Sequence, residues 1–420
     1  MTKKLIYIVA ALALLLGIIL PSVAFAAGTD TTSTTGSFGA NNSPPIIDTT
    51  QGDTSGVELY DSTGATPQTS MTPQVEYDVK VSVTDNNELK DLASVVVTLF
   101  YASPTALSGN AAAAQPVVLV GDTTGFNNGD AVIISDSLNS ETNIILSHVV
   151  NTSLTMTTNL AYGYTTPTAV VAKVPTSSNT QTAAILTCTI AHPSLTITWA
   201  IDPNSSTTWS IGTCVPPTLT DSTGTFQFLF TPGKVAKANI NPAKWFIYAK
   251  VTDQAASSAT NCTHAPKDMN IYNEIYNLGG GPVSFGATDP GTTDKACATP
   301  IDAAYIANDN YKVQVRTDHG AGNAYWQNGA TPPDDVTLQT GNGGSPNAGE
   351  FVLKAYETAT IGSAKQVKLA YDLDIMNSRT ITADVSGDDY PATTLWLSLG
   401  ASNIPSGTYS GTIYFQISNR

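Results

Sequence analysis

Short segments in which apolar and polar residues alternate recur along this chain, and they constrain its fold more than any other feature. The clearest spans residues 77–84, where tyrosine and valine alternate with Asp78, Lys80, Ser82 and Thr84. Alternation at period two is typical of a β-strand with one buried face. After residue 26 no stretch keeps a helical period for three turns, so the sequence predicts an all-β protein. The segments that predict strands before residue 255 include 76–84, 93–101, 184–190, 195–201, 225–230 and 245–251.

The N-terminus has the three parts of an export signal. Lys3 and Lys4 precede an apolar run over residues 5–20, and small residues around Ala26 and Ala27 follow it. This order predicts a signal peptide over 1–26 that is cleaved after Ala26, and hence a secreted, extracellular or cell-surface protein. An uncleaved anchor is the alternative, because the run is nearly long enough to span a bilayer. No later apolar run has that length, so we expect no membrane span after cleavage.

Charge limits the partners that this chain can have. Only 12% of the 420 residues are charged, and the net charge is −15. Nucleic acids and anionic membranes attract lysine and arginine, so the acidic balance argues against both as partners. It is compatible with a bound cation.

The spacing of the predicted strands indicates two β-sandwich domains, the first of them immunoglobulin-like. A Thr/Ser/Gly/Asn-rich stretch at 27–45 is expected to be a disordered leader. The first sandwich is predicted over 46–116 and 175–255, interrupted by a small β-barrel over 117–174 whose outer strands bring its ends together. Three domains in series is the alternative, but it leaves too few strands before residue 101 to close a core. A linker at 256–269 leads to a C-terminal β-sandwich over 270–420, with strands expected at 282–286, 311–317, 349–355, 365–369, 394–399 and 411–417.

Four cysteines follow the export signal: Cys188, Cys214, Cys262 and Cys297. In an exported chain two disulfides are the natural interpretation. The pairing Cys188–Cys214 with Cys262–Cys297 closes local loops and is the one favoured among three. Free buried thiols are the alternative.

Two regions resemble known surface domains. Residues 72–101, which contain Val-Lys-Val-Ser-Val-Thr-Asp, together with 245–253 resemble immunoglobulin-like sandwich domains of archaeal and bacterial cell-surface proteins. The C-terminal region, with Leu395-Trp396-Leu397 and the Gly-Thr-Tyr-Ser-Gly-Thr segment at 407–412, is similar to WxL-type surface domains. A second Trp-x-Leu motif is absent, because Gln327 and Asn328 follow Trp326. The resemblance implies surface display, adhesion or envelope assembly.

No motif indicates catalysis, so we expect a protein that is not an enzyme. The four histidines fall in different predicted elements, and neither a His-Glu-x-x-His nor a Gly-x-Ser-x-Gly motif occurs. A pair of carboxylates from distant strands is the alternative that one sequence leaves open. The histidines are His148, His192, His264 and His319.

One acidic loop is a candidate calcium site. Asp85, Asn87 and Asp91 offer side-chain oxygens after a predicted strand, and hard oxygen ligands suit Ca²⁺. The loop lacks the glycine and bidentate glutamate of an EF-hand, and Lys90 opposes the cation, so a plain turn is the alternative. No other cofactor is expected.

Other candidate sites lie on the expected surface. Trp199, Trp245 and Trp396 fall in apolar strands and are expected in the core, whereas Tyr325 and Trp326 lie in a polar segment and are the predicted carbohydrate or partner contact. Asn41, Asn151, Asn204 and Asn261 begin N-glycosylation sequons, with Asn204 in the most turn-like setting.

Together these features predict a secreted structural or adhesive protein of the cell surface, such as an envelope-layer, filament or cell-contact component. Its partners are expected to be envelope components, copies of itself or glycans. An extracellular carbohydrate-binding protein, or an accessory module of a polysaccharide-acting enzyme, is the alternative.

Overall fold

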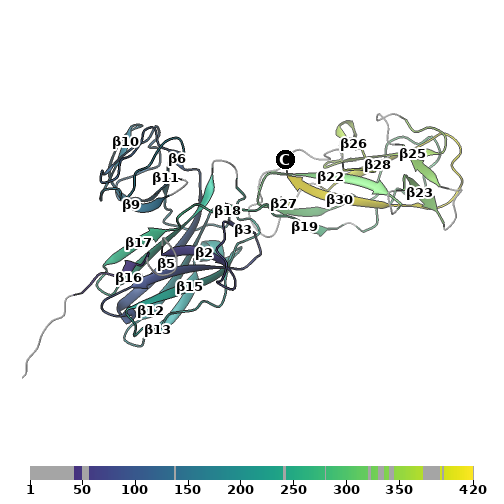
Figure 1. The fold of residues 1–420 in the computed structure, drawn as a ribbon. Helices are drawn as coiled ribbons and strands as arrows, with labels where there is room; N and C mark the ends of the chain where they lie inside the picture. The colour runs from purple at the N-terminus through teal and green to yellow at the C-terminus, as the bar shows by residue number, and fades with distance from the viewer. Residues whose placement is uncertain are drawn as a thin grey trace, which may run out of the picture. The chain divides into compact units, whose positions relative to one another are not determined.

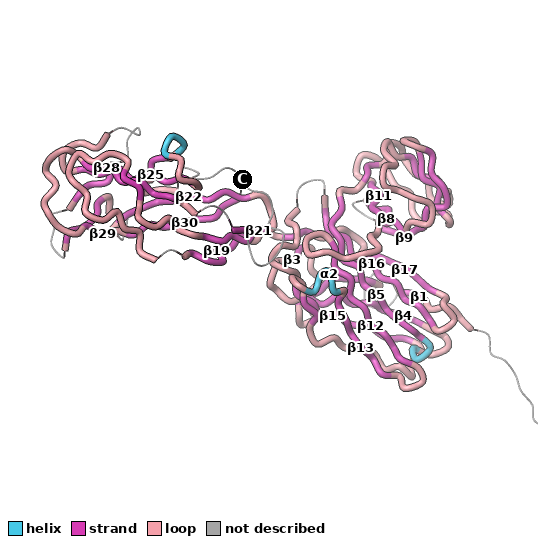
Figure 2. Tube along the Cα trace, turned by 180° about the vertical axis from the view of Figure 1, so that it is seen from behind, coloured by secondary structure: helices cyan, strands magenta, loops and turns pink. Residues whose placement is uncertain are grey.

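The computed structural model describes residues 42–49, 56–136, 139–239, 243–279, 281–319, 323–329, 335–339, 345–371, 388–389 and 392–419. Nearly all of their regular structure is β-strand (Figures 1 and 2), as predicted. Helical structure in these ranges is confined to α2 (Pro203–Ser206) and two 3-10 turns, η1 (Leu89–Asp91) and η2 (Ile361–Ser363). The predicted cleavage site at Ala26 and Ala27 and the sequon at Asn41 lie outside the described residues.

The first sandwich consists of two antiparallel five-stranded sheets. In one sheet the order is β1-β4-β15-β14, with β2 also pairing with β4, and in the other it is β13-β12-β5-β16-β17. β3 (Ser70–Met71) and β18 (Asp268–Met269) form a short parallel pair. In the chain, β3 precedes β4 and β18 follows β17. The strands of the two sheets are β1 (Ile46–Ile47), β2 (Val57–Asp61), β4 (Tyr77–Thr84), β14 (Ser210–Ile211), β15 (Thr223–Thr231), β5 (Leu92–Ala102), β12 (Ala183–Ala191), β13 (Thr196–Ile201), β16 (Lys244–Asp253) and β17 (Ser258–Cys262).

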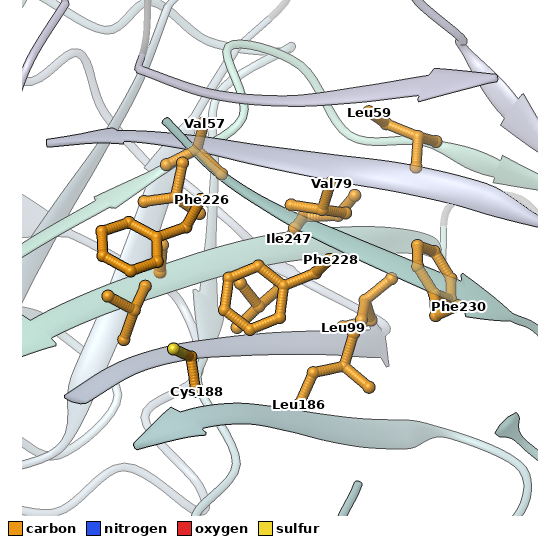
Figure 3. Packing of buried hydrophobic residues seen from close by; sticks show 14 of the residues in the cluster. Val57, Leu59, Val79, Leu99, Leu186, Cys188, Phe226, Phe228, Phe230 and Ile247 are labelled. Carbon is orange, nitrogen blue, oxygen red and sulfur yellow. The ribbon is translucent and has the colours of Figure 1, made fainter. Parts of the chain in front are cut away.

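The core of this sandwich follows directly from the alternation in the sequence. Val79 of β4 and Phe228 of β15 are neighbours in register, and both side chains are fully buried. Leu99, Leu186 and Ile247 of the other sheet belong to the same cluster (Figure 3). Removing a ring of this kind from a packed core costs about 3–5 kcal/mol.

Two buried indoles also belong to this core. The rings of Trp209 and Trp245 lie 5.4 Å apart, and each satisfies its N–H with a backbone carbonyl, of Thr180 at 3.1 Å and of Lys237 at 2.8 Å. The prediction that Trp245 and Trp396 are core residues is confirmed by their burial. Trp199 is only partly buried and packs edge-on against Phe228 at 4.9 Å.

A small β-barrel is inserted between β5 and β12. Its strand order is β6-β11-β8-β9-β10-β7, and a bridge between Leu107 and Val120 connects the first strand region to the last. It has its own core, which includes Ile134, Leu154 and Tyr164. Its sheet begins before the predicted boundary at 117. The strands are β6 (Thr105–Ala106), β7 (Val117–Leu119), β8 (Ala131–Ser135), β9 (Ser140–Val149), β10 (Ser153–Met156) and β11 (Val170–Lys173).

The two ends of the insertion meet because the flanking strands pair. Ala183 at the start of β12 lies opposite Phe100 near the end of β5. Phe100 also stacks on Phe246 at 5.5 Å, in a separate apolar cluster that includes Ile133 of the barrel and Cys262 of β17. Buried apolar side chains therefore join the barrel to the sheet from which it emerges.

The C-terminal sandwich is built from three groups of strands around a second large core. Its sheets follow the orders β19-β21-β27, β20-β28-β25-β24-β23-β29 with β26 on β25, and β22-β30. Their strands are β19 (Asn273–Leu278), β20 (Lys295–Ala296), β21 (Ala303–Ala307), β22 (Tyr311–Asp318), β23 (Tyr325–Asn328), β24 (Val336–Leu338), β25 (Glu350–Tyr356), β26 (Lys365–Gln366), β27 (Asp388–Asp389), β28 (Thr394–Leu399), β29 (Tyr409–Ser410) and β30 (Thr412–Asn419).

The structure differs from three local predictions. Residues 282–286 are not a strand, and the strand expected over 365–369 is reduced to β26. The predicted linker 256–269 contains β17 and β18, because β17 is a sheet-edge strand whose outward residues are polar. In the described ranges, no helix has the length and apolar character needed to cross a bilayer.

Candidate functional site

The acidic loop predicted as a calcium site lies at one end of the first sandwich, where strands of both sheets finish. Asp85 directly follows β4, Asp253 ends β16, and Asp91 precedes β5. Asp85 and Asp253 are each only 1% exposed. Burial raises the pKa of Asp85, the hydrogen bond from the Asn87 backbone opposes the shift, and the charges of Asp91 and Asp253 add to it.

Hydrogen bonds define which oxygens remain for a cation. Asp85 Oδ1 accepts from the Asn87 backbone N–H at 2.8 Å, while its buried Oδ2 has no hydrogen-bond partner among the described residues. Asn87 Oδ1 accepts from the Ser43 backbone N–H at 2.7 Å, and Asp91 Oδ1 accepts from Gln254 Nε2 at 3.2 Å. In the described part of the chain no set of three or more His, Cys, Asp or Glu side chains is arranged as a metal centre. Calcium binding here stays a prediction.

The four cysteines carry free thiols, so the two predicted disulfides are not observed. Cys188 is buried in the core of the first sandwich, and the Cys214 thiol donates to the Leu229 carbonyl at 3.8 Å. Cys262 and Cys297 belong to different apolar clusters, one beside the barrel and one in the C-terminal sandwich. They therefore do not close a loop within a single domain, which was the reason for pairing them.

The prediction that Trp326 is exposed was wrong. Its side chain is 9% exposed, its indole N–H donates to Thr317 Oγ1 at 3.0 Å, and its ring lies 5.0 Å from Phe351. The prediction was based on the polar residues around Trp326. These residues belong to strand β23, in which a buried side chain can stand between polar neighbours. Tyr325 is half-buried and stacks on His319 at 5.5 Å. The carbohydrate contact predicted at Tyr325 and Trp326 therefore has no exposed indole.

The sequons differ in accessibility. Asn151 is exposed in the turn between β9 and β10, and Asn204 is exposed in α2, where Asp202 Oδ1 accepts from its backbone N–H at 2.9 Å. Asn261 is half-buried on β17. Glycosylation at these positions stays a prediction.

A polar pocket that the sequence did not indicate lies between the barrel and the first sandwich. It has a volume of about 270 Å³. From the barrel it is lined by β9 and the 158–162 loop, and from the sandwich by β17 and the residues after it. Its lining residues include Glu141, Asn143, Thr158, Tyr162, Asn261 and His264. At least ninety residues separate the two walls in sequence, so no local motif marks the site.

Known proteins show little similarity to this chain. No protein-family model matches the chain, and no curated protein matches it. One solved chain, from a structure described as a chaperone–tip adhesin complex vital for activation of CFA/I fimbriae biogenesis, aligns at 10% identity with a TM-score of 0.22. That alignment covers 79% of this chain and 92% of the other. At this TM-score the likeness carries no function over to this chain.

Proposed function

We propose that this protein is an exported, non-catalytic structural or adhesive component of the cell surface that associates with copies of itself through the inserted barrel. An export signal followed by β-sandwich domains supports the location. The observation that carries the assembly role is an exposed apolar face on the barrel.

This face is formed by outward residues of β7, β9 and the turn after β9. Ser153 of β10 pairs with Val149 on one side and Leu119 on the other, so these residues share one side of the sheet. Exposed apolar side chains gathered on one face are typical of contact surfaces. The apolar barrel face comprises Val117, Leu119, Ile144, Leu146, Val149 and Val150.

Charge favours a second copy of this chain as the occupant. At a net charge of −15, two copies repel each other wherever carboxylates meet. The six side chains of the apolar barrel face are all uncharged. Two such faces can therefore meet without bringing carboxylates together, and their burial supplies the stabilisation.

Sedimentation velocity of the mature protein over a range of concentrations tests this proposal, together with electron microscopy for filaments or sheets. We expect concentration-dependent association that Leu146→Asp weakens at least about tenfold in Kd. Val75→Asp is the matched control, because Val75 is also exposed but lies in the first sandwich outside the barrel. A protein that stays monomeric at every concentration, or an association that both variants weaken equally, contradicts the proposal.

A further inference from the structure

The pocket between barrel and sandwich has walls held in place by hydrogen bonds that cross from one to the other. Ser140 Oγ donates to the His264 carbonyl at 2.7 Å, and the hydroxyls of Thr142 and Thr260 lie 2.9 Å apart. Cys262, at the end of β17, belongs to the apolar cluster that also includes Ile133 of the barrel. The pocket is therefore formed before any ligand arrives, which lowers the entropic cost of binding.

Asn143 fixes one wall of this pocket. Its Nδ2 donates to the Thr158 carbonyl at 3.1 Å, and its Oδ1 accepts from the Thr158 hydroxyl at 3.2 Å and from the Ile144 backbone N–H at 2.9 Å. These bonds tie the 158–162 loop to β9. The loop in turn positions Tyr162 beside the pocket.

Charge at the pocket excludes one class of ligand. Glu141 is 8% exposed, its Oε2 accepts from the Ala161 backbone N–H at 2.7 Å, and its Oε1 has no hydrogen-bond partner in the described part of the chain. Among the described residues that line the pocket there is no lysine or arginine. Burial raises the pKa of Glu141, and hydrogen bonds from the Ala161 and Tyr162 backbone oppose the shift. An anionic ligand would find no lysine or arginine to compensate its charge, so the pocket suits a neutral ligand that donates hydrogen bonds.

Tyr162 adds an aromatic surface to these polar groups. Its side chain is 45% exposed, although it lines the pocket. The remaining walls present amides and hydroxyls, from Asn159, Asn261, Thr49 and Thr158 among others. An aromatic ring that covers the apolar face of a ligand, beside amides and hydroxyls that meet its O–H groups, matches the two-sided chemistry of a sugar ring.

We propose that this pocket binds a neutral saccharide unit, with Tyr162 stacking on the sugar ring and the amide and hydroxyl groups around Asn159 and Asn261 holding its hydroxyls. At about 270 Å³ the volume lies near the lower end for small-molecule sites, about 300 Å³, which suits a single sugar ring rather than several. None of the six residues of the apolar barrel face lines the pocket, so either proposal can fail without the other.

The test uses full-length mature protein made in a cytoplasmic host, which attaches no glycan to Asn261. Binding is measured on an array of neutral oligosaccharides with glucose, galactose, mannose or N-acetylhexosamine termini, and of acidic ones with uronic-acid termini. Titration calorimetry with the best neutral oligosaccharide then gives Kd. We expect binding to neutral glycans only, at least about tenfold weaker in Tyr162→Ala and retained in Tyr162→Phe.

Tyr276→Ala is the matched control, because Tyr276 is 53% exposed but lies on β19 of the C-terminal sandwich. It should leave Kd unchanged, and the melting temperature of Tyr162→Ala should match that of the unaltered protein. Absence of binding to every neutral glycan overturns the proposal, as does a Kd that Tyr162→Ala leaves within twofold. A third outcome is that protein from the cytoplasmic host binds neutral glycans, whereas protein from the native source does not and carries a sugar on Asn261 by peptide mass spectrometry. The site then accepts saccharides and is occupied in the cell by the protein's own glycan.

Discussion

Asp85 directly follows β4 and Asp253 ends β16, a strand of the other sheet; each aspartate completes the sequence Val-Thr-Asp, and both side chains are buried at one end of the first sandwich. The charge of Asp253 contributes to the raised pKa of Asp85, so the two groups are close enough to repel. Asp85 Oδ2 has no hydrogen-bond donor in the described residues. A buried, repelling pair of carboxylates lowers stability unless a proton or a cation compensates it.

We therefore expect calcium to stabilise the protein through this end of the sandwich. Adding Ca²⁺ to the EDTA-treated protein should raise the melting temperature, and Asp85→Asn should abolish most of that rise. In EDTA the same variant should melt above the unaltered protein, because the repulsion is removed. Asp302→Asn, at an exposed position in the C-terminal sandwich, is the control. Equal melting temperatures in calcium and EDTA would eliminate the site.

Asp78 predicts a dependence of stability on pH. Burial raises its pKa from 3.8 to about 6, with Lys80 opposing and Asp61 reinforcing the shift. The folded state then holds this proton more tightly than the unfolded chain does, so the free energy of unfolding falls as pH rises from about 4 to about 6 and the loss persists above it. Since one pKa unit corresponds to about 1.4 kcal/mol, Asp78→Asn should gain at most about 3 kcal/mol at pH 8 and little at pH 4. Urea unfolding at both pH values measures this difference.

A contrasting carboxylate provides the check on that sign. The hydrogen bond from the Thr63 hydroxyl to Asp61 lowers the pKa of Asp61 to about 2. Its folded state holds the proton less tightly than the unfolded chain, so its contribution is present above about pH 4 and is lost as pH falls towards 2. Asp61→Asn should therefore be destabilised at pH 8, opposite to Asp78→Asn. A gain in both variants would contradict the assignment.

Alternation in the sequence identified the strands that form the first core, because a period of two determines which residues face inward. β4, β5, β12, β13, β15 and β16 lie within two residues of their predicted bounds. Edge strands such as β17 were missed, since both of their faces are largely polar and nothing in the pattern separates them from a loop. The C-terminal strands were predicted less well because several are only two or three residues long, too short for alternation to show.

The candidate site could be predicted only where it is local in the chain. Asp85 and Asp91 are six residues apart, so their loop was recognised, whereas the contribution of Asp253 depends on which strands end together. The pocket at Glu141 and Tyr162 depends on how the barrel meets β17, which no short segment encodes. Burial of Trp326 was missed because hydropathy of neighbouring residues does not report which face of a strand is covered.

Trp326 should behave as a core residue. Trp326→Ala leaves a cavity beside Phe351 and removes the donor to Thr317, so we expect the free energy of unfolding to fall by about 3–5 kcal/mol. Tyr325→Ala, one residue earlier and half-buried, should lose less. Urea unfolding followed by tryptophan fluorescence compares the two. If both variants lose a similar, small free energy of unfolding, Trp326 is not a core residue.

Thiol labelling distinguishes free cysteines from the disulfides that export predicts. Burial raises the pKa of Cys188 to about 12 and that of Cys214 to about 11, which leaves little reactive thiolate at pH 8. Cys214 is half-buried, so we expect it to be alkylated before the buried Cys188 and Cys262 in the folded protein. In denaturant without reductant all four should react, as mass spectrometry of the intact protein measures. If protein secreted by its native source gains no label until it is reduced, disulfides form after export, and Cys262 and Cys297 must then find partners that the folded chain does not bring to them.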